Sequence, residues 1–132
     1  MRDKPCLTAA DAEKAVTACK AEAQNNKWNV SIAVLDEGGY LLAFHRMDGA
    51  APISAEVAIG KARTSAMTRR PSKFFEDRVK ERPAFVNFPA GILIQGGVPI
   101  MHKGECVGAI GVSGVQSHED EQIANAGVAV LG

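Results

Sequence analysis

The sequence predicts a single α/β domain with a five-stranded antiparallel sheet and flanking helices, in the order α-β-β-α-(α)-β-β-β-α. Its 132 residues suffice for one domain and leave no room for two. Hydrophobic residues make up 46% and charged residues 23%, which is the mixture of an ordinary globular protein. Short glycine-containing turns join apolar runs, and such hairpin connections produce antiparallel pairing. The domain is therefore expected to span residues 1–132.

The first half of the chain carries a helix and a hairpin. Thr8 is the expected N-cap of an alanine-rich helix that runs to about Asn26, with Asp11 completing a variant of the capping box. Apolar residues alternate with smaller ones from residue 30 to 34, which is the period of a strand. The turn signal of residues 36–39 then predicts a returning strand over residues 40–47.

Two helices are expected next. Ser54 is a plausible N-cap for a helix of small residues that runs to about Thr68, where another backbone can approach closely. Pro71 ends this helix, and residues 72–80 predict a short amphipathic helix that breaks before Pro83.

The second half is rich in strand patterns. Residues 91–95 predict a short strand, followed by a bend at Gly96-Gly97. Residues 98–102 and 105–112 predict a hairpin around a turn at 103–104. Ser117 is the expected cap of a last helix with acidic residues in its first turn.

Charge excludes a dedicated polyanion-binding protein. Lys+Arg and Asp+Glu both number 15, so the net charge is zero. Residues 61–82 hold eight Lys/Arg against three Asp/Glu, but the stretch lacks interleaved aromatics beyond Phe74 and Phe75. We interpret it as a solvated helical face or a patch that completes an oligomer rather than a nucleic-acid contact.

The sequence also indicates the compartment. No apolar run approaches the ~20 residues that a membrane span needs. Cys6, Cys19 and Cys106 match neither a disulfide framework nor a zinc pattern. The first residues are polar, so we expect no signal peptide and a reduced, cytoplasmic protein.

The three histidines are candidate ligands. His45 lies within the strand predicted over residues 40–47, His102 ends a predicted strand, and His118 begins the last helix. No two of them stand four residues apart on one helix, so there is no local metal motif. A single axial histidine for haem needs no such partner. The more ordinary interpretation of each is a surface or hydrogen-bonded histidine.

A second cluster consists of Arg46, Asp48, Ser54 and Lys61. Lys61 lies among Ala, Gly and Ser, which is not an obviously solvated environment. It could pair with Asp48 or receive a ligand carboxylate. A structural ion pair of Asp48 with Arg46 or Lys61 is an equally weighted alternative.

Glycine and sulfur positions complete the candidates. Gly96 and Gly97 predict close backbone approach, and we include them with Ser54 among candidate ligand-binding residues. Met101 and Cys106 are expected to be cross-strand neighbours, and soft sulfur there is more often core filling than a ligand. No Ser/His/Asp or Cys/His catalytic arrangement is visible from spacing.

Taken together, these motifs resemble the GlcG/HbpS-like haem-binding family, also described as DUF336 and related to the C-terminal domain of PduO. The resemblance covers nearly the whole chain, and it is specific collectively rather than piece by piece. It rests on residues 4–8, 32–39, 41–50, 61–64, 70–71, 96–100, 108–114 and 120–127.

The resemblance implies a profilin-like α/β fold, a homo-oligomer built from dimers, and binding of haem or a corrinoid. Some haem-binding relatives take a histidine from the first helix, but residues 8–26 contain none. Three histidines (His45, His102, His118), Met101 and Cys106 therefore become the candidate ligands. Three residues that match the family motifs, Arg46, Asp48 and Lys61, would suit a small anionic ligand.

Three functional hypotheses follow. The first is a small-ligand-binding protein, with haem as the leading ligand. The second is an enzyme acting on a small carboxylate, such as an imine or enamine deaminase or a tautomerase, in which Asp48 or Lys61 exchanges a proton and Arg46 holds the carboxylate. The third is an oligomeric assembly partner without ligand chemistry.

Overall fold

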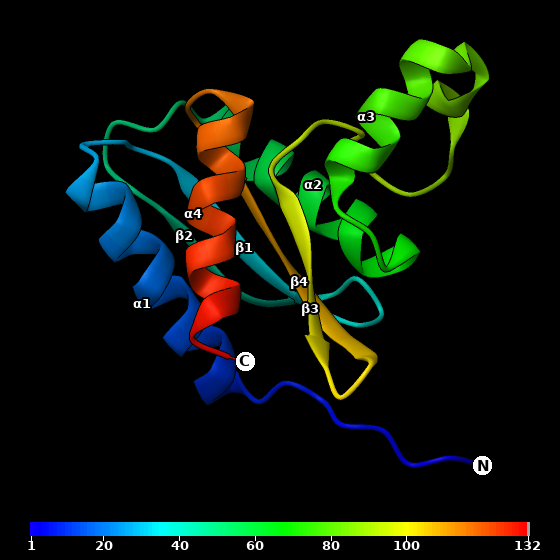
Figure 1. Ribbon diagram of the computed structural model, residues 1–132. Coiled ribbons are helices and arrows are strands. Elements are labelled where there is room, and N and C mark those ends of the chain that lie inside the picture. The colour runs from blue at the N-terminus through cyan, green and yellow to red at the C-terminus, as the bar shows by residue number, and fades with distance from the viewer. Residues whose placement is uncertain (132) are drawn as a thin grey trace.

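A computed structural model describes residues 1–131 and shows one four-stranded antiparallel sheet between helices (Figure 1). The strand order is β2-β1-β4-β3. The elements are α1 (Ala9–Asn25), β1 (Ser31–Asp36), β2 (Leu41–Arg46), α2 (Ile53–Thr68), α3 (Ser72–Glu81), the 3-10 helix η1 (Pro83–Asn87), β3 (Gly97–His102), β4 (Glu105–Ser113) and α4 (Ser117–Ala129).

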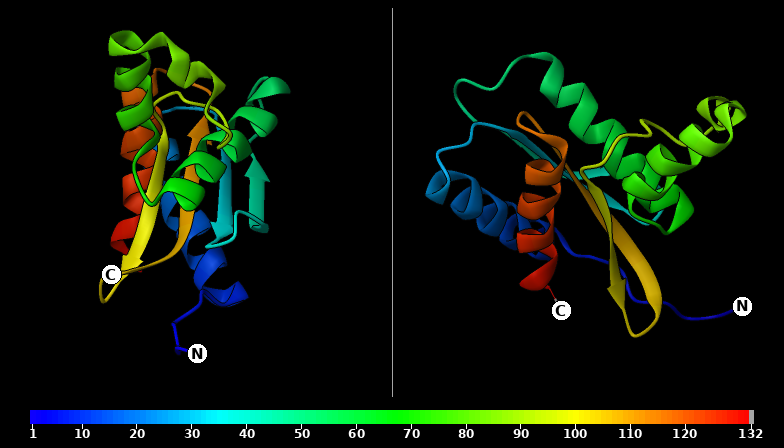
Figure 2. Two further views of the ribbon diagram at one scale, coloured as in Figure 1. Left: turned by 90° about the vertical axis from the view of Figure 1, so that its right-hand side faces the viewer. Right: turned by 45° about the horizontal axis from the view of Figure 1, so that its top comes forward.

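Each face of the sheet is covered by helices, and the alternation of side chains along the strands explains why both faces are apolar. On one face, Ile32, Val34, Ile110 and Val112 pack against α1 and α4. On the other face, Ala33, Leu35 and Ala109 pack against α2. The central strands β1 and β4 are therefore buried on both sides (Figure 2).

The beginning of α1 confirms the sequence prediction. The backbone N–H of Asp11 donates to Thr8 Oγ1 (3.1 Å), and the N–H of Thr8 donates to Asp11 Oδ2 (2.9 Å). This reciprocal capping box satisfies donors that the first helical turn cannot satisfy internally.

Both hairpins also match the prediction. β1 pairs with β2 across the turn after Asp36, and β3 pairs with β4 around Lys103 and Gly104. Met101 lies opposite Cys106, as expected, and His102 lies opposite Glu105.

The predicted fifth strand over residues 91–95 is wrong. Instead of pairing with the sheet, this segment lies along α2, where the N–H of Ile92 donates to Gly60 O (3.1 Å). Thr64 Oγ1 donates to Ile92 O (2.9 Å), and Ser72 Oγ donates to Ile94 O (2.6 Å). The backbone groups of this segment thus form their hydrogen bonds with α2 and with the side chains of Thr64 and Ser72, and not with a neighbouring strand.

Two predicted caps are displaced. α2 begins at Ile53 after Pro52, so Ser54 lies inside the helix, where its Oγ donates to Ala51 O (2.6 Å). α4 begins at Ser117, and the N–H of the preceding Gln116 donates to Glu119 Oε1 (3.1 Å).

Residues 70–94, which contain α3 and η1, form a segment that stands away from the sheet and that we call the arm (Figures 1 and 2). Phe75 and Phe88 stack inside the arm with ring centroids 5.2 Å apart. Ser72 ties its base to β3, because the N–H of Gly97 donates to Ser72 Oγ (2.8 Å).

Candidate functional site

The close packing of α2 on the sheet determines where Lys61 lies. A Cβ at Gly111 would be 2.1 Å from Ala58 O, and one at Gly97 would be 2.3 Å from Lys61 O. Only glycine permits such close approach of two backbones. The Lys61 side chain is consequently enclosed, with a relative exposure of 2%.

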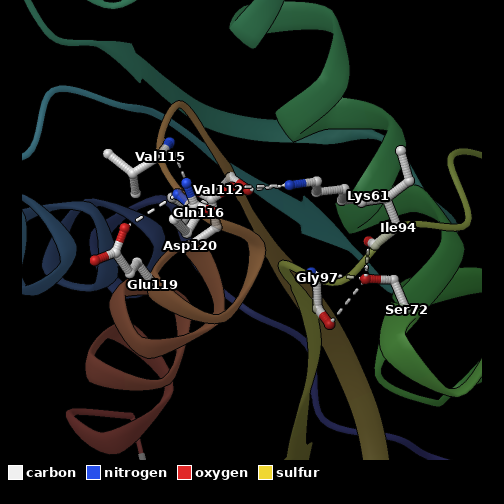
Figure 3. A network of polar contacts seen from close by, with 9 residues as sticks. All are labelled: Lys61, Ser72, Ile94, Gly97, Val112, Val115, Gln116, Glu119 and Asp120. Atoms are coloured by element: carbon white, nitrogen blue, oxygen red, sulfur yellow. Dashed lines mark hydrogen bonds and ion pairs between the residues drawn. The ribbon is translucent and has the colours of Figure 1, made fainter. Parts of the chain in front are cut away.

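Lys61 pairs with Asp120 of α4, and not with Asp48 as the sequence suggested. Its Nζ donates to Asp120 Oδ2 (3.0 Å) and to Val112 O (3.1 Å), while Asp120 Oδ1 accepts from the N–H of Val115 (3.1 Å) (Figure 3). Burial raises the pKa of the Asp120 carboxyl, although the Lys61 ammonium acts in the opposite direction. The pair joins α2, the end of β4 and α4 across the interior.

Gly96, Gly97 and Ser54 lie in the close packing around α2. Gly96 has φ +137°, and a Cβ there would be 2.7 Å from Lys61 Nζ. Gly97 contacts Ser72 and Lys61 as described above. The Oγ of Ser54 lies 2.8 Å from Ser31 Oγ, and both serines are buried.

A first hollow lies where the end of β2 and the residues after it meet the second half of α1. It has a volume of about 390 Å³ and combines His45, Arg46 and Asp48 with Lys20 and other polar residues. Arg46, Asp48 and Lys20 form no ion pair within residues 1–131. The hollow therefore offers cations and a carboxylate to a small polar ligand, but Lys61 does not line it.

A second hollow, which we call the His102 hollow, lies beside β3. The N-terminal segment, the first turns of α1 and the residues that follow α4 surround it. Its volume is about 230 Å³. Its polar contributors are His102, Lys14, Asp11 and Cys6. The apolar walls are Pro5, Leu7, Ile100, Val107, Val130 and Leu131.

Sequence reasoning selected His102 but missed Lys14 and the apolar walls of this hollow. Lys14 has the pattern of a solvated helical residue, and it is indeed exposed. No local signal shows that the start of α1, the end of β3 and the residues after α4 come together. The residues that line the hollow extend from Pro5 to Leu131, so only the folded structure brings them close.

The remaining candidate ligands differ in accessibility. Met101 is 46% exposed, and His118 is also exposed. Cys106 is buried, and its thiol donates to Gly108 O (3.3 Å). Burial raises the pKa of the Cys19 thiol to about 12, so that thiol stays protonated and unreactive.

Two further observations concern residues 1–131. No three His, Cys, Asp or Glu side chains gather there in a way that could hold a metal ion. No helix there combines the length and the apolar character that crossing a membrane requires.

Comparison with protein families identifies one match. The model described as "Haem degrading protein HbpS-like" matches residues 7–129. Protein GlcG of Escherichia coli (strain K12) is 46% identical over 114 residues, which cover 86% of this chain and 85% of that protein.

Solved structures show the same fold. A double mutant of HbpS from Streptomyces reticuli superposes with a TM-score of 0.93 at 37% identity, covering 100% of this chain and 91% of that one. A structure described as a complex of PduOC with haem superposes with a TM-score of 0.87, covering 95% and 94% of the two chains. At 23% identity the latter likeness concerns the fold alone.

Proposed function

Because this chain belongs to the HbpS-like family, we propose that it binds haem, with His102 as the axial ligand in the His102 hollow. The position of the three histidines supports this choice. His45 lines a hollow of charged and amide side chains, and His118 lies exposed on α4. Only His102 combines an accessible imidazole with apolar walls and a neighbouring lysine.

The chemistry of the hollow fits one edge of a tetrapyrrole. A neutral imidazole is a common axial ligand of haem iron, and apolar side chains suit the macrocycle. The ammonium of Lys14 would hold a propionate by a charge-assisted hydrogen bond.

The size of the hollow determines how haem would be enclosed. Ligand pockets commonly measure about 300–1,000 Å³, whereas the His102 hollow measures about 230 Å³. One chain would therefore cover only part of the macrocycle, and the rest would face solvent or a second subunit. Haem iron held by His102 would supply one-electron and oxygen chemistry.

The enzyme alternative receives no support from the site. In that alternative Asp48 or Lys61 exchanges a proton while Arg46 holds the substrate carboxylate. Lys61 is instead 2% exposed and engaged with Asp120 and Val112, so it is closed off from the hollow that holds Asp48. We propose binding alone, in a reduced cytoplasmic setting.

Titration of the purified apo-protein with hemin tests this function. We expect a saturable, shifted Soret band in the wild type, because an imidazole ligand perturbs the absorption of the iron porphyrin. We expect His102→Ala to lose that band, since no other imidazole lines the hollow.

His45→Ala is the matched control, because it removes an imidazole from a strand end outside the His102 hollow. It should bind hemin like the wild type. A band that survives His102→Ala and disappears in His45→Ala would contradict the assignment. Absence of a saturable band in the wild type would overturn haem binding itself.

A further inference from the structure

We propose that the hollow between α1 and the end of β2, which we call the Arg46 hollow, binds an acidic α-amino acid, a ligand with two carboxylates and one ammonium group. Three observations carry this inference. The charged groups of the hollow have no ion-pair partners, the backbone fixes their positions, and their charges match those of such a ligand. The Arg46 hollow shares no lining residue with the His102 hollow, so the inference does not depend on haem.

The charged side chains of the Arg46 hollow lack partners in the folded chain. Lys20, Arg46 and Asp48 line it, and none of them forms an ion pair within residues 1–131. In the arm, by contrast, neighbouring charges do pair, since Lys73 Nζ lies 2.7 Å from Asp77 Oδ2. Arg46 and Asp48 are only two residues apart and yet remain unpaired, so both are available to a ligand.

Regular structure fixes the positions of these groups. Arg46 is the last residue of β2, which pairs along its length with the central strand β1. Lys20 lies on α1 and is partly buried. The N–H of Ala50 donates to Met47 O (3.2 Å), and this bond closes the turn that carries Asp48. Groups held by a strand, a helix and a hydrogen-bonded turn lose little freedom when a ligand binds.

Uncharged polar groups complete the lining. Gln24, Asn29 and His45 contribute two amides and an imidazole, which both donate and accept hydrogen bonds. Asn29 packs closely on the turn, because a Cβ at Gly49 would be 3.0 Å from Asn29 Nδ2. The volume of about 390 Å³ lies within the range of about 300–1,000 Å³ that is common for ligand pockets. A small polar ligand thus finds partners for its uncharged groups as well.

Charge indicates the class of ligand. With His45 neutral, Lys20 and Arg46 supply two positive charges and Asp48 one negative charge, a net of +1. An amino acid of the glutamate or aspartate class carries two carboxylates and one ammonium group, so each of its charges can meet a charge of opposite sign. A dicarboxylate without the ammonium group would leave Asp48 unmatched among like charges, and this repulsion selects against it.

This site differs from the one that the sequence suggested. The sequence grouped Lys61 with Arg46 and Asp48 around an anionic ligand, but Lys61 is enclosed beside Asp120. In the structure Lys20 supplies the second cation. The carboxylate of Asp48 then becomes the group that recognises the ammonium of the ligand.

Isothermal titration calorimetry of the purified apo-protein with L-glutamate and L-aspartate tests the site. We expect saturable binding of at least one of them. That amino acid should bind about tenfold or more tightly than the dicarboxylate of the same length without the amino group, glutarate or succinate, because only the amino acid pairs with Asp48. Absence of saturable binding of both amino acids at millimolar concentration would overturn the proposal.

Arg46→Gln tests the location. This variant should bind the amino acid about tenfold or more weakly, since it removes a cation that faces a ligand carboxylate. Arg63→Gln is the matched control, because Arg63 is exposed on α2 and does not line the hollow. It should bind like the wild type. Far-UV circular dichroism checks that both variants are folded. Unchanged affinity in Arg46→Gln, or an equal loss in the two variants, would refute the location.

Asp48→Asn tests the recognition of the ammonium group. It should weaken binding of the amino acid without weakening binding of the dicarboxylate, so the ratio of the two affinities should fall about tenfold. A merely structural role of Asp48 would weaken both ligands alike, and an unchanged ratio would overturn the assignment. Because no hemin is present, none of these results bears on haem binding.

Discussion

At the scale of single residues, the Lys61–Asp120 pair places two charges where water cannot reach them. Both side chains are 2% exposed. Removing two charges from water costs free energy that their attraction and hydrogen bonds must offset. Removal of one partner alone leaves the other charge buried without compensation, and this asymmetry makes the pair testable.

Replacing Lys61 with Met should lower the free energy of unfolding by about 3–5 kcal/mol, because the Asp120 carboxylate would remain buried without its cation. Urea unfolding measures the loss. Lys73→Met is the matched control. Its ion pair with Asp77 is solvent-exposed, so this substitution should cost at most about 1 kcal/mol.

Adding Asp120→Asn to Lys61→Met should recover part of the loss. The amide oxygen of the asparagine can still accept from the N–H of Val115, while the uncompensated charge is gone. Equal destabilisation in the single and double variants would show that lost packing, rather than charge, explains the effect.

The sequence predicted the environment of Lys61 but not its partner. A lysine among small residues on a helical stripe indicated an unsolvated position, which the structure confirms. Asp120 has the pattern of an acidic residue that stabilises the first turn of a helix, and nothing local connects it with a lysine 59 residues earlier. Pairings across the fold follow from packing, which local patterns do not encode.

At the scale of elements, the capping box of α1 consists of two hydrogen bonds between Thr8 and Asp11, and it stabilises the first turn of that helix. Thr8→Ala should lower the free energy of unfolding by about 0.5–2 kcal/mol, because the N–H of Asp11 loses its acceptor. Thermal unfolding measures this change. Thr17→Ala is the control, since Thr17 Oγ1 only donates to Glu13 O on the exposed side of α1 and alanine favours helix. A larger loss in the Thr17 variant would contradict the assigned cap.

Hairpins were predictable because their signal lies within a few residues: alternating side chains and a glycine turn. The segment at residues 91–95 also has an apolar pattern, yet it pairs with α2 and Ser72. An apolar run of this length indicates that the segment is buried. It does not indicate which groups will form hydrogen bonds with the backbone N–H and C=O groups of the segment. The histidine candidates show the same limit, because only the fold distinguishes the surroundings of His102 from those of His45.

At the scale of the whole molecule, the arm and the sheet should differ in local stability. β1 and β4 are buried between helices, whereas most of the arm is exposed on the single chain. Local opening is easiest where few apolar groups are buried. This difference in local stability can be measured.

Hydrogen–deuterium exchange should therefore be faster in α3 and η1 than in β1 and β4 of the same protein. Mass spectrometry of peptides from each element measures the difference. Equal protection of the arm and of the two central strands would contradict the expected difference in local stability.

The order of strands leaves β2 and β3 at the two edges of the sheet, where unpaired backbone groups can recruit strands from other molecules and lead to aggregation. Pro99 lies in the middle of β3 and has no N–H to offer an incoming strand. On β2, His45 and Arg46 bring polar and charged groups to the opposite edge. Both exposed edges of the sheet are thus unfavourable partners for a strand of another molecule, which should keep the folded chain from assembling edge to edge as its concentration rises.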